Sequence, residues 1–304
     1  MSNNVSGVLV ADIKRNALDD GPGIRTTLFS KGCHLSCVWC QNPETKSPKQ
    51  ELLYDSKSCI GCGNCMKACE QAAIAIQSDG VYPVDKLSCI LCGKCVSACP
   101  VQAIRFAGRH YEVDELCNKL LQDAIFFKHS GGGVTFSGGE PTFHLDFISI
   151  VAANLKQRGT HLCLETCGLY NHENFKAKLL PFLDLVYFDI KIFDGDKHKK
   201  YCGVPNAGIL ENFKLLIKEA SVNVLPRIPL IPDITTDTEN LLAIKNFLQD
   251  CGINKVGLLP YNPLWLSKPS NTKETALYTR NEWMSKEERE AIKEIFKGFV
   301  FRNF

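Results

Sequence analysis

Sixteen cysteines stand in this chain of 304 residues, and eleven of them fall into three short runs. The runs are Cys33, Cys37 and Cys40, then Cys59, Cys62, Cys65 and Cys69, then Cys89, Cys92, Cys95 and Cys99. The first twenty residues mix charged and polar types without a long apolar stretch, so we expect no export signal and a cytoplasmic protein. Because disulfides are rare in a reducing compartment, the runs predict metal ligation by thiols.

The second and third runs repeat one another at an offset of 30 residues. Their neighbours recur with them, since Ile60, Gly63, Ala68, Ala73 and Ile74 return as Ile90, Gly93, Ala98, Ala103 and Ile104. This repetition indicates an internal duplication. We therefore expect two copies of one structural unit, related by a pseudo-twofold axis.

The spacing of both repeated runs, C-x2-C-x2-C-x3-C, is typical of bacterial ferredoxins, in which the fourth cysteine ligates the neighbouring cluster. It predicts one [4Fe-4S] cluster on Cys59, Cys62, Cys65 and Cys99, and a second on Cys89, Cys92, Cys95 and Cys69. The alternative is a pair of structural zinc sites, but these usually join two C-x2-C halves through a longer spacer. One departure from the ferredoxin pattern is Glu70, which follows the second run where proline is usual.

Outside residues 50–108, short apolar runs alternate with stretches of helical periodicity. The strand candidates are Ile24–Phe29, Gly133–Phe136, His161–Glu165, Leu185–Ile190, Val222–Ile228 and Lys255–Leu259. The helix candidates are Val113–Phe127, Asp146–Gln157, His172–Leu180, Ala207–Ala220, Thr238–Asp250 and Ser285–Phe296. Six strand–helix pairs predict an α/β fold whose parallel sheet curls into a partial (β/α)6 TIM-like barrel. We expect the barrel in residues 1–49 and 109–304, with a ferredoxin-like domain inserted at residues 50–108.

Polar and glycine-rich clusters stand where the candidate strands end. They are Lys31–Cys33, Ser137–Pro141, Glu165–Thr166, Asp189–Lys191, Arg227 and Tyr261–Asn262. Ligands bind at the carboxyl ends of parallel strands, so we expect these residues to meet on one rim. Burial of a charged side chain costs free energy unless it has a partner, so Glu165, Asp189 and Lys191 need a partner or a ligand there. A structural alternative is that Asp189 and Lys191 simply neutralise one another.

The first run supplies three cysteines and leaves a cubane one ligand short. An open iron can bind substrate directly, as the open position of a catalytic zinc does. The alternative is a zinc site completed by His34, although two adjacent side chains would have to fold back onto one ion. We assign no role to the remaining cysteines, which are Cys117, Cys163, Cys167, Cys202 and Cys251, and we expect Cys117 to pack in the core.

Four motifs outside the ferredoxin spacing carry a family resemblance. Cys33–Cys40 has the C-x3-C-x2-C form with Trp39 before the third cysteine, and resembles the signature of the radical S-adenosylmethionine (SAM) superfamily. Together with Asp20–Thr27 (DGPGIRTT), Gly132–Pro141 (GGVTFSGGEP) and Asp189–Lys191 (DIK), it is similar to the activating enzymes of glycyl-radical enzymes. The resemblance covers essentially the whole chain, including an insert that many members carry.

The resemblance implies roles for individual residues. Cys33, Cys37 and Cys40 would hold the catalytic cluster, and SAM would chelate its open iron. Gly138, Gly139 and Glu140 would contact the methionine amine of SAM, and Trp39 and Gln41 would lie near its adenine. Asp189, Ile190 and Lys191 would contact its ribose and carboxylate. Asn262 stands where many members have a His that binds the ribose. Glu165–Thr166 matches a segment that binds a monovalent cation in part of the family, with Glu in place of Asp.

The resemblance also implies the reaction. One electron from the cluster cleaves SAM into methionine and a 5′-deoxyadenosyl radical, which takes hydrogen from a backbone glycine of a partner glycyl-radical enzyme. Asp20 would meet the partner's glycyl loop, or else cap the turn at Gly21. Flavodoxin or ferredoxin would supply electrons. Residues 265–283 are polar and distinctive, and we expect them to contribute to partner choice.

Two other functions compete with activation, namely radical chemistry on a small metabolite and simple electron carriage. The DGPG segment counts against the first, and a carrier would need no open cluster. The overall charge of the chain is nearly neutral, because 35 Lys and Arg against 33 Asp and Glu give a net charge of +2. That balance favours neither nucleic acid nor a membrane surface. No run approaches the ~18 apolar residues of a membrane span.

Overall fold

The computed structural model describes residues 7–75, 85, 87–219, 221–268 and 277–302. Its strands are β1 Val8–Ala17, β2 Arg25–Ser30, β3 Leu52–Tyr54, β4 Ile104–Phe106, β5 Arg109–Tyr111, β6 Gly133–Gly138, β7 His161–Thr166, β8 Leu185–Asp189, β9 Asn223–Leu230, β10 Lys255–Pro260 and β11 Val300–Arg302. Its helices are α1 Asn64–Lys67, α2 Lys94–Ser97, α3 Val113–Leu120, α4 Ala124–Ser130, α5 Leu145–Gln157, α6 His172–Lys178, α7 Gly195–Cys202, α8 Ala207–Leu216, α9 Thr238–Asp250 and α10 Lys286–Ile295.

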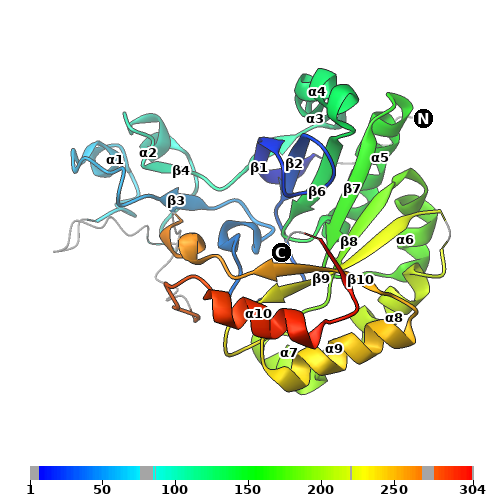
Figure 1. Ribbon diagram of the computed structural model, residues 1–304. Helices are drawn as coiled ribbons and strands as arrows, with labels where there is room; N and C mark the ends of the chain where they lie inside the picture. The colour runs from blue at the N-terminus through cyan, green and yellow to red at the C-terminus, as the bar shows by residue number, and fades with distance from the viewer. Residues whose placement is uncertain (1–6, 76–84, 86, 220, 269–276, 303–304) are drawn as a thin grey trace.

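One large sheet organises the molecule. Its nine strands lie in the order β11-β10-β9-β8-β7-β6-β2-β1-β5. The run from β2 through β6 to β11 is parallel, whereas β1 pairs antiparallel with both β2 and β5. All six predicted strands are present and parallel, so the α/β class is confirmed. Helices follow these strands and pack along the outer side of the sheet, as Figure 1 shows for α5, α6, α8 and α9.

Strong hydrophobic burial explains why the central strands form where the sequence predicts them. Every residue of β6 except its last is buried, and so is every residue of β8 except Asp189. Near-continuous apolar runs are typical of parallel strands covered on both faces. The main core lies between these strands and the apolar faces of the surrounding helices, including α5 and α9.

Several elements were not predicted from the sequence. The missed strands in the large sheet are β1, β5 and β11, and the missed helices are α7 and the short α1 and α2 of the cysteine-rich segment. The helix expected over residues 113–127 is broken, because α3 ends at Leu120 and a 3-10 turn at Leu121–Asp123 precedes α4. Asp123 is buried at this turn and accepts hydrogen bonds from Arg15 of β1 and Thr26 of β2. A long-range contact thus interrupts a locally helical pattern.

The segment between β3 and β4 extends away from the large sheet (Figure 1). Its two repeats share local structure, since α1 follows Gly63 at φ +71° and α2 follows Gly93 at φ +78°. Their contacts are reciprocal, because the Asp55 amide donates to the Ala103 carbonyl at 2.8 Å and the Asp85 amide donates to the Ala73 carbonyl at 2.7 Å. Each repeat therefore closes on the other, as a pseudo-twofold duplication requires.

No helix among the residues that the structure describes is both long and apolar enough to cross a membrane.

Candidate functional site

A cavity of about 880 Å³ lies at the carboxyl ends of the parallel strands. The predicted rim residues that line it are Cys33, Cys37, Cys40, Trp39, Gln41, Gly138, Gly139, Glu165, Thr166, Asp189, Lys191, Arg227, Tyr261 and Asn262. Asp20 also lines it, whereas Lys31, Gly32, Glu140, Pro141 and Ile190, which were predicted at the same rim, do not. Parallel pairing accounts for this convergence, because it brings the ends of successive strands to one edge.

The loop that carries the first cysteine run follows β2 directly and is anchored at several points. The Gly32 amide donates to the Thr45 carbonyl at 2.7 Å, which closes the base of the loop. Further along, the Ser36 amide donates to Cys202 at 2.8 Å, and the Val38 amide donates to Tyr201 at 3.0 Å. These bonds fix the residues on both sides of Cys37 against the C-terminal end of α7.

The three thiols of this loop are in an environment that suits a soft metal cluster. Burial raises the pKa of Cys33 to about 12 and that of Cys40 to about 11. The pKa of Cys37 is also raised, first by a hydrogen bond with Cys202 and then by burial. Thiols ligate metals as thiolates, so binding here would release protons. Three sulfur donors facing one cavity fit an iron–sulfur cluster by ligand chemistry.

The Gly138–Glu140 segment presents backbone to the cavity and a buried carboxylate behind it. A Cβ on Gly138 would come within 2.3 Å of the Ser30 nitrogen, and its φ is +113°, so glycine is required for β6 to approach β2. Glu140 is 1% exposed. Its carboxylate accepts hydrogen bonds from the Thr142 amide and hydroxyl, the Thr166 hydroxyl and the Cys167 amide. Protein donors therefore occupy this carboxylate, which was expected to receive an amine.

Charged side chains form a network across the strand ends. The Arg227 guanidinium donates to Asp189 at 2.9 Å and to Glu165 at 2.5 Å, and Lys191 donates to Asp189 at 3.0 Å. Burial opposes these charges, yet the neighbouring carboxylates outweigh it and raise the pKa of Arg227 and of Lys191. Burial likewise opposes the charge of Asp189, but Arg227 and Lys191 lower its pKa. The ion pair expected as the structural alternative is thus present, and Arg227 extends it to Glu165.

The remaining predicted contacts occupy distinct places. Trp39 is buried in the cavity wall, whereas Ile190 lies in the hydrophobic core and donates its amide to the Arg227 carbonyl at 2.9 Å. The Asn262 side chain caps the turn that follows β10, since it accepts from the Leu264 amide at 2.9 Å. The Asp20 carboxylate accepts from the Thr27 hydroxyl at 2.7 Å. Asn262 and Asp20 therefore face the cavity while each already holds a protein partner.

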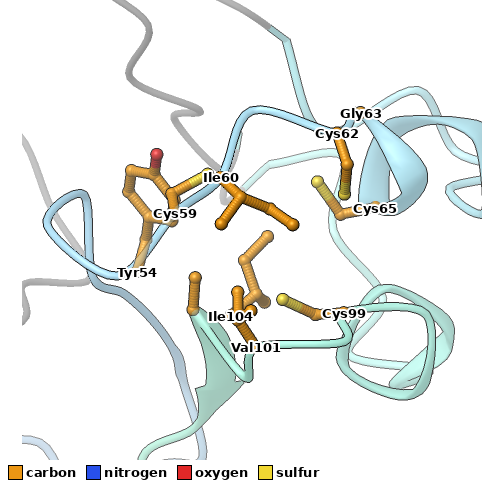
Figure 2. A pocket seen from close by; sticks show the side chains of 10 residues that line it. Tyr54, Cys59, Ile60, Cys62, Gly63, Cys65, Cys99, Val101 and Ile104 are labelled. Carbon is orange, nitrogen blue, oxygen red and sulfur yellow. The ribbon is translucent and has the colours of Figure 1, made fainter.

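Two smaller cavities lie in the duplicated segment. Cys59, Cys62 and Cys65 of the first repeat surround one of them with Cys99 of the second (Figure 2). The other is lined by Cys89, Cys92 and Cys95 with Cys69 of the first repeat. The crossed grouping of cysteines predicted from the spacing is therefore the grouping around these cavities. Within the described parts of the chain, no three His, Cys, Asp or Glu side chains are arranged to hold a single metal ion.

Several cavity residues escaped the sequence analysis. They are Asp19, Phe29, Leu35, Asn42, Cys167, Pro229, Ile231, Leu259, Pro260, Trp283, Met284 and Arg289. Trp283, Met284 and Arg289 come from the approach to α10 and its first turns, far along the chain from the motifs. The distinctive segment 265–283 was the only signal for them, and residues 269–276 of it lie outside the described residues.

Comparison with known proteins supports the assignment that the motifs suggested. The Radical SAM superfamily matches residues 27–243. The trans-4-hydroxy-L-proline dehydratase activating enzyme of Clostridioides difficile is 40% identical over 96% of this chain and 97% of its own length. The benzylsuccinate synthase activating enzyme of Thauera aromatica is also 40% identical, over 79% of this chain and 73% of its own.

A third relative extends the same pattern. The isethionate sulfite-lyase activating enzyme of Nitratidesulfovibrio vulgaris is 37% identical over 84% of this chain and 85% of its own length. The superfamily match spans the cysteine loop, the Gly138–Glu140 segment and the charged strand ends, which are the features that build the large cavity. This chain belongs to the radical SAM superfamily, within the activating enzymes of glycyl-radical enzymes.

Proposed function

We propose that residues 50–108 form a ferredoxin-like domain inserted into a partial (β/α)6 barrel made by residues 1–49 and 109–304. The reciprocal contacts of the two repeats support this reading, as does the grouping of four cysteines around each small cavity. One [4Fe-4S] cluster is held by Cys59, Cys62, Cys65 and Cys99, and the other by Cys69, Cys89, Cys92 and Cys95.

In the large cavity, Cys33, Cys37 and Cys40 hold the catalytic [4Fe-4S] cluster, and its remaining iron is open to SAM. The backbone of Gly138 and Gly139 receives the methionine ammonium, and Glu140 supports that backbone from behind through its bonds to the neighbouring strands. Glu140 therefore contributes by holding the loop in shape. The observation that carries the proposal is the meeting of Cys33, Cys37 and Cys40 with these glycines in one cavity.

The other SAM contacts come from the cavity walls. Trp39 and Gln41 flank the adenine, Asn262 contacts the ribose, and Asp189 with Lys191 contacts the ribose and carboxylate. Ile190 acts by packing, because it fixes the backbone between those two charged residues. The positive charge of Arg227 neutralises part of the negative charge of Glu165 and Asp189. These two carboxylates therefore repel the carboxylate of SAM less strongly.

The cluster and SAM together supply the chemistry: one electron breaks the S–C5′ bond, and the resulting 5′-deoxyadenosyl radical removes a hydrogen atom from a partner's glycine. The chain's own residues orient SAM, exclude water and admit the glycyl loop beside Asp20. Flavodoxin or ferredoxin in the cytoplasm supplies the electron, and the protein partner is a glycyl-radical enzyme. No constellation for acid–base catalysis is needed.

Anaerobic reconstitution tests the proposal. The wild-type protein should hold about twelve irons per chain in three four-iron clusters, and should release 5′-deoxyadenosine from SAM when dithionite is added. The Cys37→Ala variant should keep about eight irons and lose this cleavage. The control variant Cys117→Ala removes a buried thiol outside the proposed sites, and it should keep all twelve irons and still cleave SAM. Native-rate cleavage by Cys37→Ala, or four irons or fewer in the wild type, would contradict the assignment.

A further inference from the structure

Lys31 is a fully buried charged residue that the proposed chemistry does not use. It follows β2 directly and precedes the loop that carries Cys33, yet it does not line the large cavity. Its side chain is 0% exposed. Burial of an ammonium group costs free energy unless acceptors surround it, so the partners of Lys31 indicate what it does in this place.

The partners of the Lys31 side chain come from two different parts of the chain. Its ammonium donates to the Glu44 carbonyl at 2.5 Å and to the Glu51 carboxylate at 3.2 Å. Glu44 lies at the end of the cysteine loop, next to the residue whose carbonyl closes the base of that loop. Glu51 belongs to the insert, residues 50–108, and directly precedes β3. One buried charge therefore joins the cysteine loop to the start of the insert.

The backbone of Lys31 is itself fixed to the barrel. Its amide donates to the Leu9 carbonyl of β1 at 3.0 Å. Its carbonyl accepts a hydrogen bond from the His144 ring at 2.6 Å, and His144 ends the 3-10 turn that follows β6. The ammonium of Lys31 thus projects from a fixed point of the large sheet.

The chain leaving the insert passes the same lysine. The Ala107 amide donates to the Glu51 carbonyl at 2.7 Å, which pairs the two ends of the insert. Gly108 follows at φ +100°, and a Cβ there would come within 2.7 Å of the Val10 carbonyl oxygen and 3.1 Å of the Lys31 Cδ. Glycine is required for this close approach. Both ends of the insert therefore meet beside the Lys31 side chain.

Apolar packing does not attach the core of the insert to the barrel. Its buried apolar residues form a cluster of their own, which consists of Leu52, Cys65, Ile74, Cys95 and Ile104. The main core contains no residue from the described part of the insert. A cavity of about 490 Å³ lies between Tyr54 and Lys57 of the insert and Leu264 and Lys268 after β10. The polar junction at Lys31 is thus a major determinant of how the insert is held.

We propose that Lys31 is a positioning residue that locks the insert to the cysteine loop, and so fixes the distance between the insert clusters and the catalytic cluster. This inference rests on the proposed function, because it takes the clusters to lie where the cysteines are grouped. Removal of one partner of a buried ion pair is strongly destabilising, so a change at Lys31 acts directly on the junction. The rate of electron transfer between two clusters falls steeply with distance, so the junction sets how fast electrons pass between them.

Amide hydrogen exchange of the full reconstituted chain tests the junction directly. Lys31→Met removes the ammonium and keeps a side chain of similar length, and Glu51→Gln removes the charge of the acceptor. Loss of one charge-assisted hydrogen bond should increase opening of the junction about ten- to hundredfold. The Ala107 amide should then exchange faster by this factor, because its bond to Glu51 protects it. The matched control Lys156→Met breaks a pair with Asp184 elsewhere in the barrel.

Pulsed electron paramagnetic resonance supplies a second measurement that general loss of stability would not imitate. The magnetic coupling between the reduced catalytic cluster and the insert clusters depends on the distance between them. We expect Lys31→Met and Glu51→Gln to keep about twelve irons and to show a broader range of distances. Lys156→Met should keep the wild-type distances, and the amides of β6 should exchange at wild-type rates in all three variants.

The supporting result is faster exchange at Ala107 together with broader cluster distances in Lys31→Met and Glu51→Gln, and neither change in Lys156→Met. Wild-type exchange and distances in both junction variants would overturn the inference. Loss of the catalytic irons in Lys31→Met, with a wild-type junction in Glu51→Gln, would also overturn it, because Lys31 would then serve the cysteine loop alone. Four irons or fewer in the wild type would instead refute the proposed function, and exchange at Ala107 would still decide whether Lys31 holds the insert.

Discussion

Glu140 illustrates how a residue in a recognisable motif can act through its neighbours. Both of its carboxylate oxygens accept hydrogen bonds from the protein, and the four donors come from its own turn, from the last residue of β7 and from the residue that follows it. A buried charged acceptor with this many partners is expensive to disturb. At the same time it ties the end of β6 to the end of β7, and so fixes the glycine backbone that faces the cavity.

Glu140→Gln should therefore destabilise the fold by about 2–4 kcal/mol, because the new amide places a donor against the donors that bind the carboxylate. Urea denaturation of the reconstituted protein measures the change. Glu294→Gln is a control at an exposed carboxylate that pairs with Lys297 at the surface, and should cost less than about 1 kcal/mol. Equal stability of Glu140→Gln and wild type would show that the carboxylate is free to serve a ligand.

Asp189 stands between a structural and a ligand-binding role, because it pairs with Arg227 and Lys191 and also lines the cavity. Asp189→Asn should weaken SAM binding by about ten- to hundredfold, since one charge-assisted hydrogen bond contributes about 1.5–3 kcal/mol. Equilibrium binding of SAM to the reconstituted protein measures this. An unchanged affinity together with a much lower melting temperature would assign Asp189 to the ion network alone.

At the scale of elements, Asp123 links strands β1 and β2 to the helices α3 and α4. It lies between α3 and α4, is 1% exposed, and accepts from Arg15 of β1 and Thr26 of β2. The bond from Arg15 holds the pKa of this carboxyl below its ordinary value. A carboxyl whose pKa falls on folding stabilises the native state above its unfolded pKa, and this stabilisation is lost as pH falls through the folded value.

Asp123→Asn should accordingly lower the free energy of unfolding by about 1–2 kcal/mol at pH 7, a value reduced because Arg15 is half exposed. The difference from wild type should stay constant between pH 8 and pH 5.5, and shrink only as pH falls below about 4. Asp146→Asn, at an exposed pair with Lys178, should change little. A difference that varies between pH 8 and pH 5.5 would implicate another titrating partner.

At the scale of the whole molecule, the duplicated segment raises the question of why eight cysteines accompany the large cavity. They surround two cavities of their own, in a part of the chain that extends away from the large sheet (Figure 1). A surface built only to dock a partner would need no such set of thiols. We propose that they relay electrons from an external donor toward the catalytic cluster, which would account for their number and spacing.

Replacement of Cys62 and Cys92 by alanine should therefore slow activation when flavodoxin or ferredoxin supplies electrons, and largely spare cleavage of SAM driven by dithionite. The 5′-deoxyadenosine produced and the glycyl radical signal of the partner are measured in parallel. Cys117→Ala is the matched control for loss of a thiol outside the segment. If the segment only docks the partner, the glycyl radical fails with both donors while SAM cleavage stays normal with both.

Features that depend on neighbouring residues could be predicted from the sequence. The spacing of ligand cysteines follows from how a short loop wraps a cluster. The cysteine runs and their crossed grouping could therefore be predicted from the sequence. Hydrophobic runs and helical periodicity located the six parallel strands and most helices, because burial of a strand or a helix face leaves a local pattern. Parallel topology then implied that Cys33, Gly138, Asp189 and Asn262 would meet on one rim.

Contacts between distant segments were decided only by the tertiary structure. Nothing local indicates that four donors converge on Glu140, that Arg227 stands between Glu165 and Asp189, or that the Ser36 amide donates to the Cys202 carbonyl. Residues such as Trp283 and Arg289 reach the cavity because the chain folds back after β10, where α10 packs against α9. Such pairings depend on three-dimensional packing, and a single sequence records only the residues that take part and not which of them become neighbours.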